Sequence, residues 1–337
     1  MNLAFTHTGK RFFFITLVLE GRPEALSGFV DEQSRPRLTA LGEIVKAAFV
    51  AVHQVWPAAT LSDFVIMPDH IHFILIVNYE VAPDFNPLFF SHILMTAIEQ
   101  GWANHHGQGS GAPNQANPHH GQGSEAPEPP AVEGLPRFDR RAYIELAFTA
   151  PMLRTIRHYI KLNPARRLWK LAHPDRFLCH PNINAQLLKR LPPRRWQGMG
   201  NLTLLGSPFL FNVRLTLKKS VAEHEAAICE IVDKAKHGWV PVSGFISPGE
   251  VEALRRLKAT PGTRFIKMLP CALPPRYDPS AEDSRELAAD RLLILSGFAD
   301  TTAMPARDIR KYLAASHQFR ANCLAMNDLA AALCSMI

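Results

Sequence analysis

Two histidines stand two residues apart in the segment MPDHIHF, residues 67–73. Side chains alternate along a β-strand, so on a strand His70 and His72 face the same side while Ile71 points into the opposite layer. Two neutral imidazoles can converge on one divalent ion, but a hard ion such as Mg²⁺ also needs an oxygen ligand. The pair therefore predicts part of a metal site, and the alternative is a strand with two solvent-facing histidines.

A second group of reactive side chains lies in RHYIKLNPARR, residues 157–167. Tyr159 and Asn163 are four residues apart, so on a helix they share one face. A phenol oxygen there supplies a nucleophile, and an amide oxygen at a fixed separation supplies a metal ligand. The alternative is a tyrosine on the surface of a helix with a solvated basic face.

Positive charge is concentrated around this tyrosine. Residues 137–196 contain 14 Lys and Arg against 3 Asp and Glu, whereas residues 1–136 contain 6 against 13. Residues 221–337 are balanced, with 14 of each sign. The basic block at residues 137–196 would attract phosphate-rich ligands, and the alternative interpretation is a solvated face without a partner. The candidate DNA-binding residues are Arg140, Arg141, Arg154, Arg157, Lys161, Arg166 and Arg167.

The elements that must position these residues are those of an α+β layer. Apolar runs and helical spacing predict strand, helix, strand, strand and helix at residues 11–20, 37–55, 60–67, 71–77 and 87–103. This order suits an antiparallel sheet with helices on one face. A further helix is expected at residues 150–163, ending near Asn163 because Pro164 does not extend it.

A low-complexity segment interrupts the first half of the chain at residues 104–134, where HHGQGSGAP recurs as HHGQGSEAP. It has almost no apolar residues, so we expect a disordered insertion. The first domain then comprises residues 1–103 and 135–197, with an irregular Pro- and Arg-rich part at residues 173–200.

Residues 198–337 are expected to form a second domain in which strands and helices alternate. The expected strands are LTLL, VPVSG, RFIKML and LLILS, at residues 202–205, 240–244, 264–269 and 292–296. The expected helices lie at residues 218–237, 248–259 and 280–290, and two more follow. This alternation is typical of a parallel, Rossmann-like α/β sheet.

Taken together, MPDHIHF and RHYIKLNPARR resemble the REP-associated tyrosine transposases, within the wider group of single-strand HUH transposases. That family reads close to MPNHVH at its metal strand and carries Tyr-Ile, Asn-Pro and Arg along its tyrosine helix. The stretch DRRAYIELAFTAPMLRTI, residues 139–156, is also similar to the family's approach to that helix. The resemblance covers about residues 10–170, with the segment 104–134 as an unusual insertion.

The resemblance implies a ferredoxin-like HUH nuclease domain that binds Mg²⁺ or Mn²⁺. His70 and His72 match the metal pair, Asn163 completes the site and Tyr159 matches the nucleophile. The implied reaction cleaves and rejoins single-stranded or hairpin DNA through a 5′-phosphotyrosine. Asp69 departs from the family's Asn, and it either adds charge to the site or caps the turn.

The segments SGFISPGE, RELAADRLLILSGF and FRANCLAMNDLAAAL in the second half resemble the Rossmann-like DNA-processing protein A family. Ser243, Gly244 and Ser247 follow a predicted strand, where such sheets bind nucleotides or phosphates. Arg320 and Asn322 match the family's Arg-Asn pair, but an intervening alanine weakens the transferred role.

Other features bound the function. The sequence contains no run of eighteen apolar residues, so no membrane span is predicted. Its five scattered cysteines form no CxxC pair, which fits a reducing cytosol. We therefore expect a cytoplasmic, nucleoid-associated bacterial protein. One tyrosine nucleophile per chain suggests a homodimer or sequential action. The alternatives are a hairpin-DNA-binding protein that does not cleave, and a nucleotide-sensing or single-strand-binding accessory protein that acts through its second domain.

Overall fold

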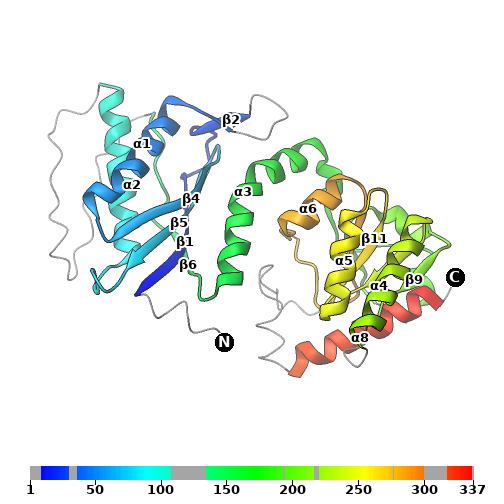
Figure 1. Cartoon of the computed structure of the whole chain (residues 1–337). Coiled ribbons are helices and arrows are strands. Elements are labelled where there is room, and N and C mark those ends of the chain that lie inside the picture. Colours follow the sequence, from blue (N-terminus) through cyan, green and yellow to red (C-terminus); the bar gives the residue numbers. More distant parts are fainter. Residues whose placement is uncertain are drawn as a thin grey trace. The chain divides into compact units, whose positions relative to one another are not determined.

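The chain folds into two compact units, Met1–Leu168 and Trp169–Ile337, each with its own sheet and apolar cores (Figure 1). The structure is a computed structural model. It describes residues 9–29, 36–107, 134–192, 194–215, 220–275, 277–299 and 317–335.

A four-stranded sheet in the order β4-β5-β1-β6 forms the N-terminal unit, and all of its pairings are antiparallel. The elements along the chain are β1 (Lys10–Val18), α1 (Ala40–Val55), β4 (Ala59–Ile66), β5 (His70–Asn78), α2 (Pro87–His105) and β6 (Tyr143–Leu146). A small hairpin of β2 (Ser27–Phe29) and β3 (Pro36–Leu38) lies between β1 and α1. This β-α-β-β-α-β order with two split crossovers is the ferredoxin-like arrangement.

Alternating side chains give this sheet two apolar faces. Phe13 and Ile15 of β1 belong to the core that contains α1 and α2, whereas Phe14 belongs to the core on the other face. There Phe14 packs in one cluster with Ile156 and Ile160 of α3 (Ala150–Ala172). The two helices expected with this sheet, α1 and α2, lie on one face as predicted, and α3 covers the second face, which is apolar too (Figure 1).

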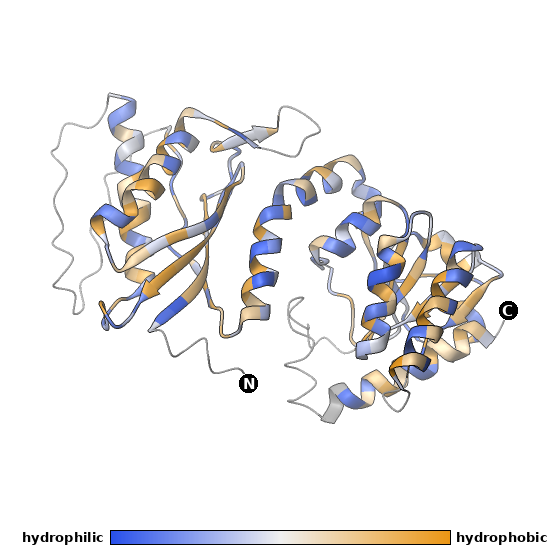
Figure 2. Cartoon of the chain, in the orientation of Figure 1, coloured by the Kyte–Doolittle hydropathy of each residue, from blue (hydrophilic) through white to orange (hydrophobic). Residues whose placement is uncertain are grey.

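The helix α3 also continues beyond its predicted end at Asn163, with Pro164 inside it. A proline removes one helical hydrogen bond, but burial of residues on both sides of it, such as Ile160 and Arg166, holds the helix together. Figure 2 shows hydrophilic and hydrophobic residues mixed along α3, beside the more uniformly hydrophobic strands of the sheet.

The C-terminal unit has a six-stranded sheet in the order β7-β8-β12-β11-β10-β9. Its strands are β7 (Cys179–His180), β8 (Gln197–Gly200), β9 (Leu210–Asn212), β10 (Val240–Ser243), β11 (Phe265–Leu269) and β12 (Leu292–Ser296). Strands β9 to β12 are mutually parallel, while β8 and β7 add antiparallel pairings at one edge. The sheet is thus mixed rather than wholly parallel.

Helices cover both faces of this sheet, as buried parallel strands require. The described helices are α4 (Val221–Lys236), α5 (Pro248–Ala259), α6 (Ala281–Ala288) and α8 (His317–Ser335), with short 3₁₀ turns η2 (Pro174–Phe177), η3 (Leu188–Arg190) and η4 (Leu202–Gly206). Residues of α8 pack in one core with β10 and β11, and residues of α4, α5 and α6 pack in another.

Three sequence predictions in this region are wrong. The segment LTLL forms η4 instead of a strand, because the side chain of Asn201 accepts a hydrogen bond from the Thr203 amide and nucleates a turn. Residues 173–200 contain β7 and β8 and are not simply irregular. β8 pairs with β12 and β7 pairs with β8, so both strands belong to the C-terminal unit, which begins at Trp169 rather than near residue 198.

Some expectations lie outside the described residues. They include residues 108–133 of the predicted disordered insertion at 104–134, and the first of the two helices expected after β12. Among the described residues, no helix combines the length and apolar character that a membrane crossing requires.

Candidate functional site

Both histidines of the predicted pair lie at the start of β5 and face α3. His72 is buried, at 5% exposure, and pairs across the sheet with Thr16. Ile71 lies in the opposite core with α1 and α2, as the alternation predicts. The ring centroids of His70 and His72 are 4.6 Å apart, so the two imidazoles share one small space.

The Nδ1 atom of each imidazole is engaged by a neighbouring side chain. Nδ1 of His70 lies 2.7 Å from Oδ1 of Asp69, and Nδ1 of His72 lies 2.8 Å from the hydroxyl oxygen of Thr16. A metal-binding histidine is typically fixed in this way through its other ring nitrogen. Nε2 is therefore the nitrogen through which each ring would bind a metal.

Asp69 orients His70. Its buried carboxylate also lies 3.2 Å from Arg22 and 3.4 Å from Arg167. Burial alone would raise the pKa of Asp69, but the hydrogen bond to His70 and the charges of His70, Arg167 and Arg22 lower it to about 2. Asp69 thus places a fixed negative charge behind one imidazole.

Tyr159 lies on the face of α3 that meets the histidines. Its ring centroid is 5.3 Å from that of His72 and 5.9 Å from that of Phe14. The guanidinium of Arg166 stands 4.8 Å from the centre of the tyrosine ring, within cation–π range. The structure therefore brings together the two motifs that are 87 residues apart in sequence, counting from His72 to Tyr159.

The third predicted ligand, Asn163, is buried at 7% exposure one helical turn beyond Tyr159. Among the described residues, no group of three His, Cys, Asp or Glu side chains is placed to hold a metal ion. A metal on the two imidazoles therefore depends on an oxygen ligand of another kind. The amide of Asn163 is of that kind, and its role as a ligand stays a prediction.

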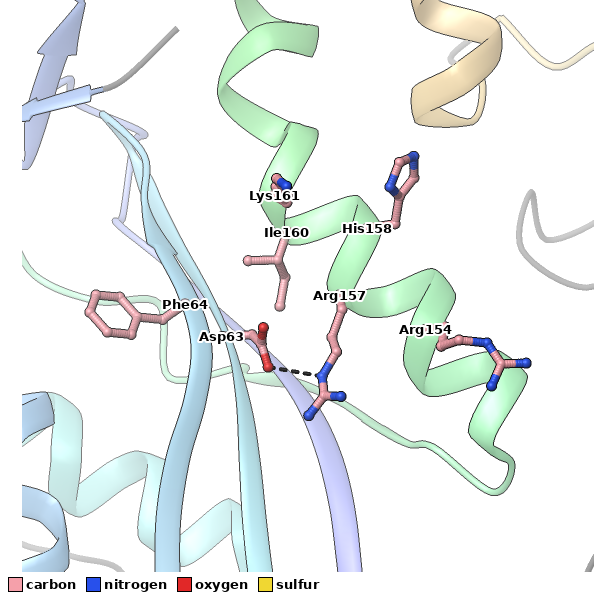
Figure 3. A pocket seen from close by; sticks show the side chains of 7 residues that line it. All are labelled: Asp63, Phe64, Arg154, Arg157, His158, Ile160 and Lys161. Carbon is pink, nitrogen blue, oxygen red and sulfur yellow. Dashed lines mark hydrogen bonds and ion pairs between the residues drawn. The ribbon is translucent and has the colours of Figure 1, made fainter. Parts of the chain in front are cut away.

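Three of the seven predicted DNA-binding residues line one open pocket of about 450 Å³ between α3 and the edge strand β4 (Figure 3). They are Arg154, Arg157 and Lys161, and all three are exposed. Asp63 of β4 enters the same pocket, where its carboxylate lies 2.9 Å from Nε of Arg157.

The other four predicted DNA-binding residues have structural partners. Arg140 forms an ion pair of 2.5 Å with the buried Glu99 of α2, and Arg141 pairs with Asp139. Arg166 is buried against Tyr159, and Arg167 pairs with Glu24 as well as Asp69. Of these four, Arg141 presents its side chain to solvent, at 90% exposure.

The loop after β10 holds the residues predicted to bind a phosphate. The carboxylate of the buried Glu250 accepts hydrogen bonds from the backbone amides of Ile246 and Ser247, which a phosphate would otherwise use. A Cβ on Gly244 would stand 2.1 Å from the terminal methyl of Met326 on α8. The close packing of α8 explains the glycine at position 244, and the cap by Glu250 explains the conformation of the loop. A ligand role for the loop stays a prediction. Arg320 and Asn322 lie near the start of α8.

Sequence reasoning missed Thr16 and Asp63. Thr16 meets His72 only through the register of β1 on β5, which no local pattern specifies. Asp63 sits at a β-bulge with φ of 39°, and an Asp within a strand-like run was the one signal of such an irregularity.

Comparison with solved structures finds partial, distant matches. DNA processing protein A from Helicobacter pylori, studied for its single-stranded DNA binding mode, is 25% identical over 47% of this chain and 67% of its own, with a TM-score of 0.34. A REP-associated tyrosine transposase bound to a REP hairpin is 16% identical over 47% of this chain and 69% of its own, with a TM-score of 0.28. No protein-family model and no curated protein sequence matches this chain.

Proposed function

We propose that this protein cleaves and rejoins single-stranded or hairpin DNA with Tyr159 as its nucleophile. The observation that carries the proposal is the contact between the rings of Tyr159 and His72, 5.3 Å apart between centroids, with His70 beside them. A phenol next to two fixed imidazoles combines a nucleophile with ligands for a divalent ion.

The phenol oxygen of Tyr159 attacks the scissile phosphorus, loses its proton and forms a new oxygen–phosphorus bond. The bond from phosphorus to the 3′ oxygen breaks, and that oxygen takes up a proton to become a 3′-hydroxyl. The 5′-phosphotyrosine keeps the phosphoester for the reverse attack by a hydroxyl end. The guanidinium of Arg166, 4.8 Å from the centre of the tyrosine ring, places positive charge beside the phenol that would meet the phosphate.

The donor set fits a divalent ion. His70 and His72 would hold it through Nε2, with the amide oxygen of Asn163 as the third ligand. Mg²⁺ or Mn²⁺ bound there would polarise the scissile phosphate. Asp69 and Thr16 keep the imidazoles oriented, and the packing of Phe14 against His72 keeps the rings in place.

The test is incubation of the full chain with labelled hairpin DNA and Mn²⁺, followed by denaturing electrophoresis. The expected result is a covalent protein–DNA adduct that disappears in Tyr159→Phe, because phenylalanine keeps the ring contacts and lacks the attacking oxygen. Tyr143→Phe is the matched control, since Tyr143 also lies near Phe14 but on β6 and should leave the adduct unchanged.

Two results would contradict the proposal. An adduct that persists in Tyr159→Phe assigns the nucleophile to another residue. Tight hairpin binding without an adduct under any divalent metal leaves the alternative, a hairpin-binding protein that does not cleave.

A further inference from the structure

The pocket between β4 and α3 contains an ion pair that has the properties of a competitive anion site. We propose that it binds a backbone phosphate of single-stranded DNA, and that Asp63 sets the affinity by competing with that phosphate for Arg157. The choice of DNA as the ligand rests on the proposed function, whereas the anion site itself rests on the pocket.

The charges that line the pocket favour an anion. Arg154, Arg157 and Lys161 are cationic, and Asp63 carries the one negative side chain among the lining residues. The pocket thus keeps two formal positive charges after the Asp63–Arg157 pair is counted. A guanidinium fork and an ammonium group are the side chains that recognise phosphate oxygens.

Asp63 is held in position by the backbone. It stands at the bulge of β4, where the strand register shifts between Ser62 and Phe64, with a left-handed φ of 39° that aspartate tolerates better than most residues. The Ser62 hydroxyl donates to the same carboxylate oxygen that contacts Arg157. In Figure 3 this carboxylate meets Arg157 across the pocket.

The pair is easy to exchange. The side chains of Arg157 and Asp63 are 45% and 38% exposed, and ion pairs with this exposure contribute little net stability. A phosphate that reaches Arg157 can also contact Arg154 and Lys161. Among the ion pairs of the described residues, Asp63 pairs with neither of these two. The incoming anion therefore gains more than the carboxylate loses.

The lining favours the backbone of a strand over its bases. Phe64 points away from α3 in Figure 3, and its ring packs on Phe49 at 5.3 Å between centroids. No aromatic ring of the lining residues other than the imidazole of His158 is therefore available for base stacking. His158 and Ile160 flank Tyr159 in sequence, so a strand in the pocket passes along the helix that carries the nucleophile.

The test measures fluorescence anisotropy of a labelled single-stranded oligonucleotide with the full chain in EDTA, so that binding is separated from cleavage. Arg157→Gln should weaken binding roughly three- to ten-fold and lower the logarithmic salt slope by about 0.7, the value for one single-strand phosphate contact. Asp63→Asn should tighten binding by a similar factor, because the competing charge is gone. The double variant should bind like Arg157→Gln alone.

Arg255→Gln is the matched control, because Arg255 is also an exposed arginine with one carboxylate partner, Glu252, but lies on α5. Unchanged or weaker binding by Asp63→Asn, in protein that melts like wild type, would overturn the inference. The adduct test separates the two proposals. If the adduct forms equally well in Arg157→Gln and Asp63→Asn, the pocket is refuted as a DNA site while Tyr159 remains the nucleophile. If binding depends on the pocket but no adduct forms, the pocket is supported and the proposed cleavage is refuted.

Discussion

At the scale of single residues, the site depends on what lies behind the two imidazoles. Asp69 and Thr16 each engage one Nδ1 atom, and Asp69 is itself held by Arg22 and Arg167. Partners of this kind fix the orientation of a ligand and raise its basicity, so their removal weakens metal binding without removing any ligand.

Asp69→Ala should therefore lower the affinity for Mn²⁺ by about 10- to 100-fold, measured by titration calorimetry. Asp69→Asn should lose less, because an amide oxygen still accepts a hydrogen bond from His70 but carries no charge. An alanine variant that binds Mn²⁺ like wild type would show that His70 needs no support, or that it is not a ligand.

Asp283 in the C-terminal unit is, like Asp69, a buried carboxylate held beside cationic side chains. It is buried on α6, and its carboxylate lies 2.8 Å from Lys258 and 2.7 Å from Lys267. Burial alone would raise the pKa of Asp283, but the ammonium groups of Lys267 and Lys258 hold it well below its usual range. The folded state therefore favours the charged carboxylate.

Asp283→Ala should lower the free energy of unfolding by about 3–5 kcal/mol, because it leaves two largely buried ammonium groups without this partner. In the wild type, the contribution of Asp283 is present above its unfolded pKa of about 3.9 and is lost as pH falls toward the lower folded value. Urea denaturation at neutral pH measures the effect. Glu230→Gln, which breaks an exposed pair with Lys234, is the control and should change stability by less than about 0.5 kcal/mol.

At the scale of elements, two ion pairs bracket the segment of α3 that carries Tyr159. Arg157 pairs with Asp63 on β4, and Arg167 pairs with Asp69, the residue before β5. Between them, Ile156 and Ile160 pack on Phe14 and Ile74 of the sheet. The apolar contacts fix the distance of α3 from the sheet. The two ion pairs help to fix the position of α3 along its own axis relative to the strands.

The sequence predicted the elements with strong periodicity and missed those that depend on partners far away in the chain. The strand at β12 and the helix α5 lie where the apolar pattern put them. The strands β7 and β9 are two and three residues long, too short for any period, and they exist because β8 and β10 offer them hydrogen bonds.

The same division holds for the site. The faces of His72 and Tyr159 follow from the local period of their elements, whereas the meeting of the two rings was expected only from the resemblance of the paired motifs. Thr16 and Asp63 were not expected, because the first depends on strand register and the second on a bulge. Arg140 shows the opposite case, since composition predicts that it binds DNA while its guanidinium pairs with the buried Glu99 in the fold, and a DNA contact for it stays a prediction.

At the scale of the whole molecule, the two units have separate cores. The clusters around Phe13 and Phe14 belong to one, and those around Val242 and Phe265 belong to the other. Units with independent cores need not unfold together.

Calorimetry of the full chain should therefore resolve two unfolding transitions. Asp283→Ala should lower the midpoint of one and leave the other in place, and addition of Mn²⁺ should raise the midpoint that the variant does not affect. A single transition shifted as a whole by the substitution would contradict independent unfolding.

The division between the units falls inside α3, which runs from Ala150 to Ala172 without a break. The four residues after Leu168 in this helix, Trp169–Ala172, make about one helical turn, since a turn takes about 3.6 residues. The residues before them, such as Ile156 and Ile160, pack on the first sheet. An N-terminal unit produced on its own is therefore expected to melt at a higher temperature when its chain ends at Ala172 than when it ends at Leu168.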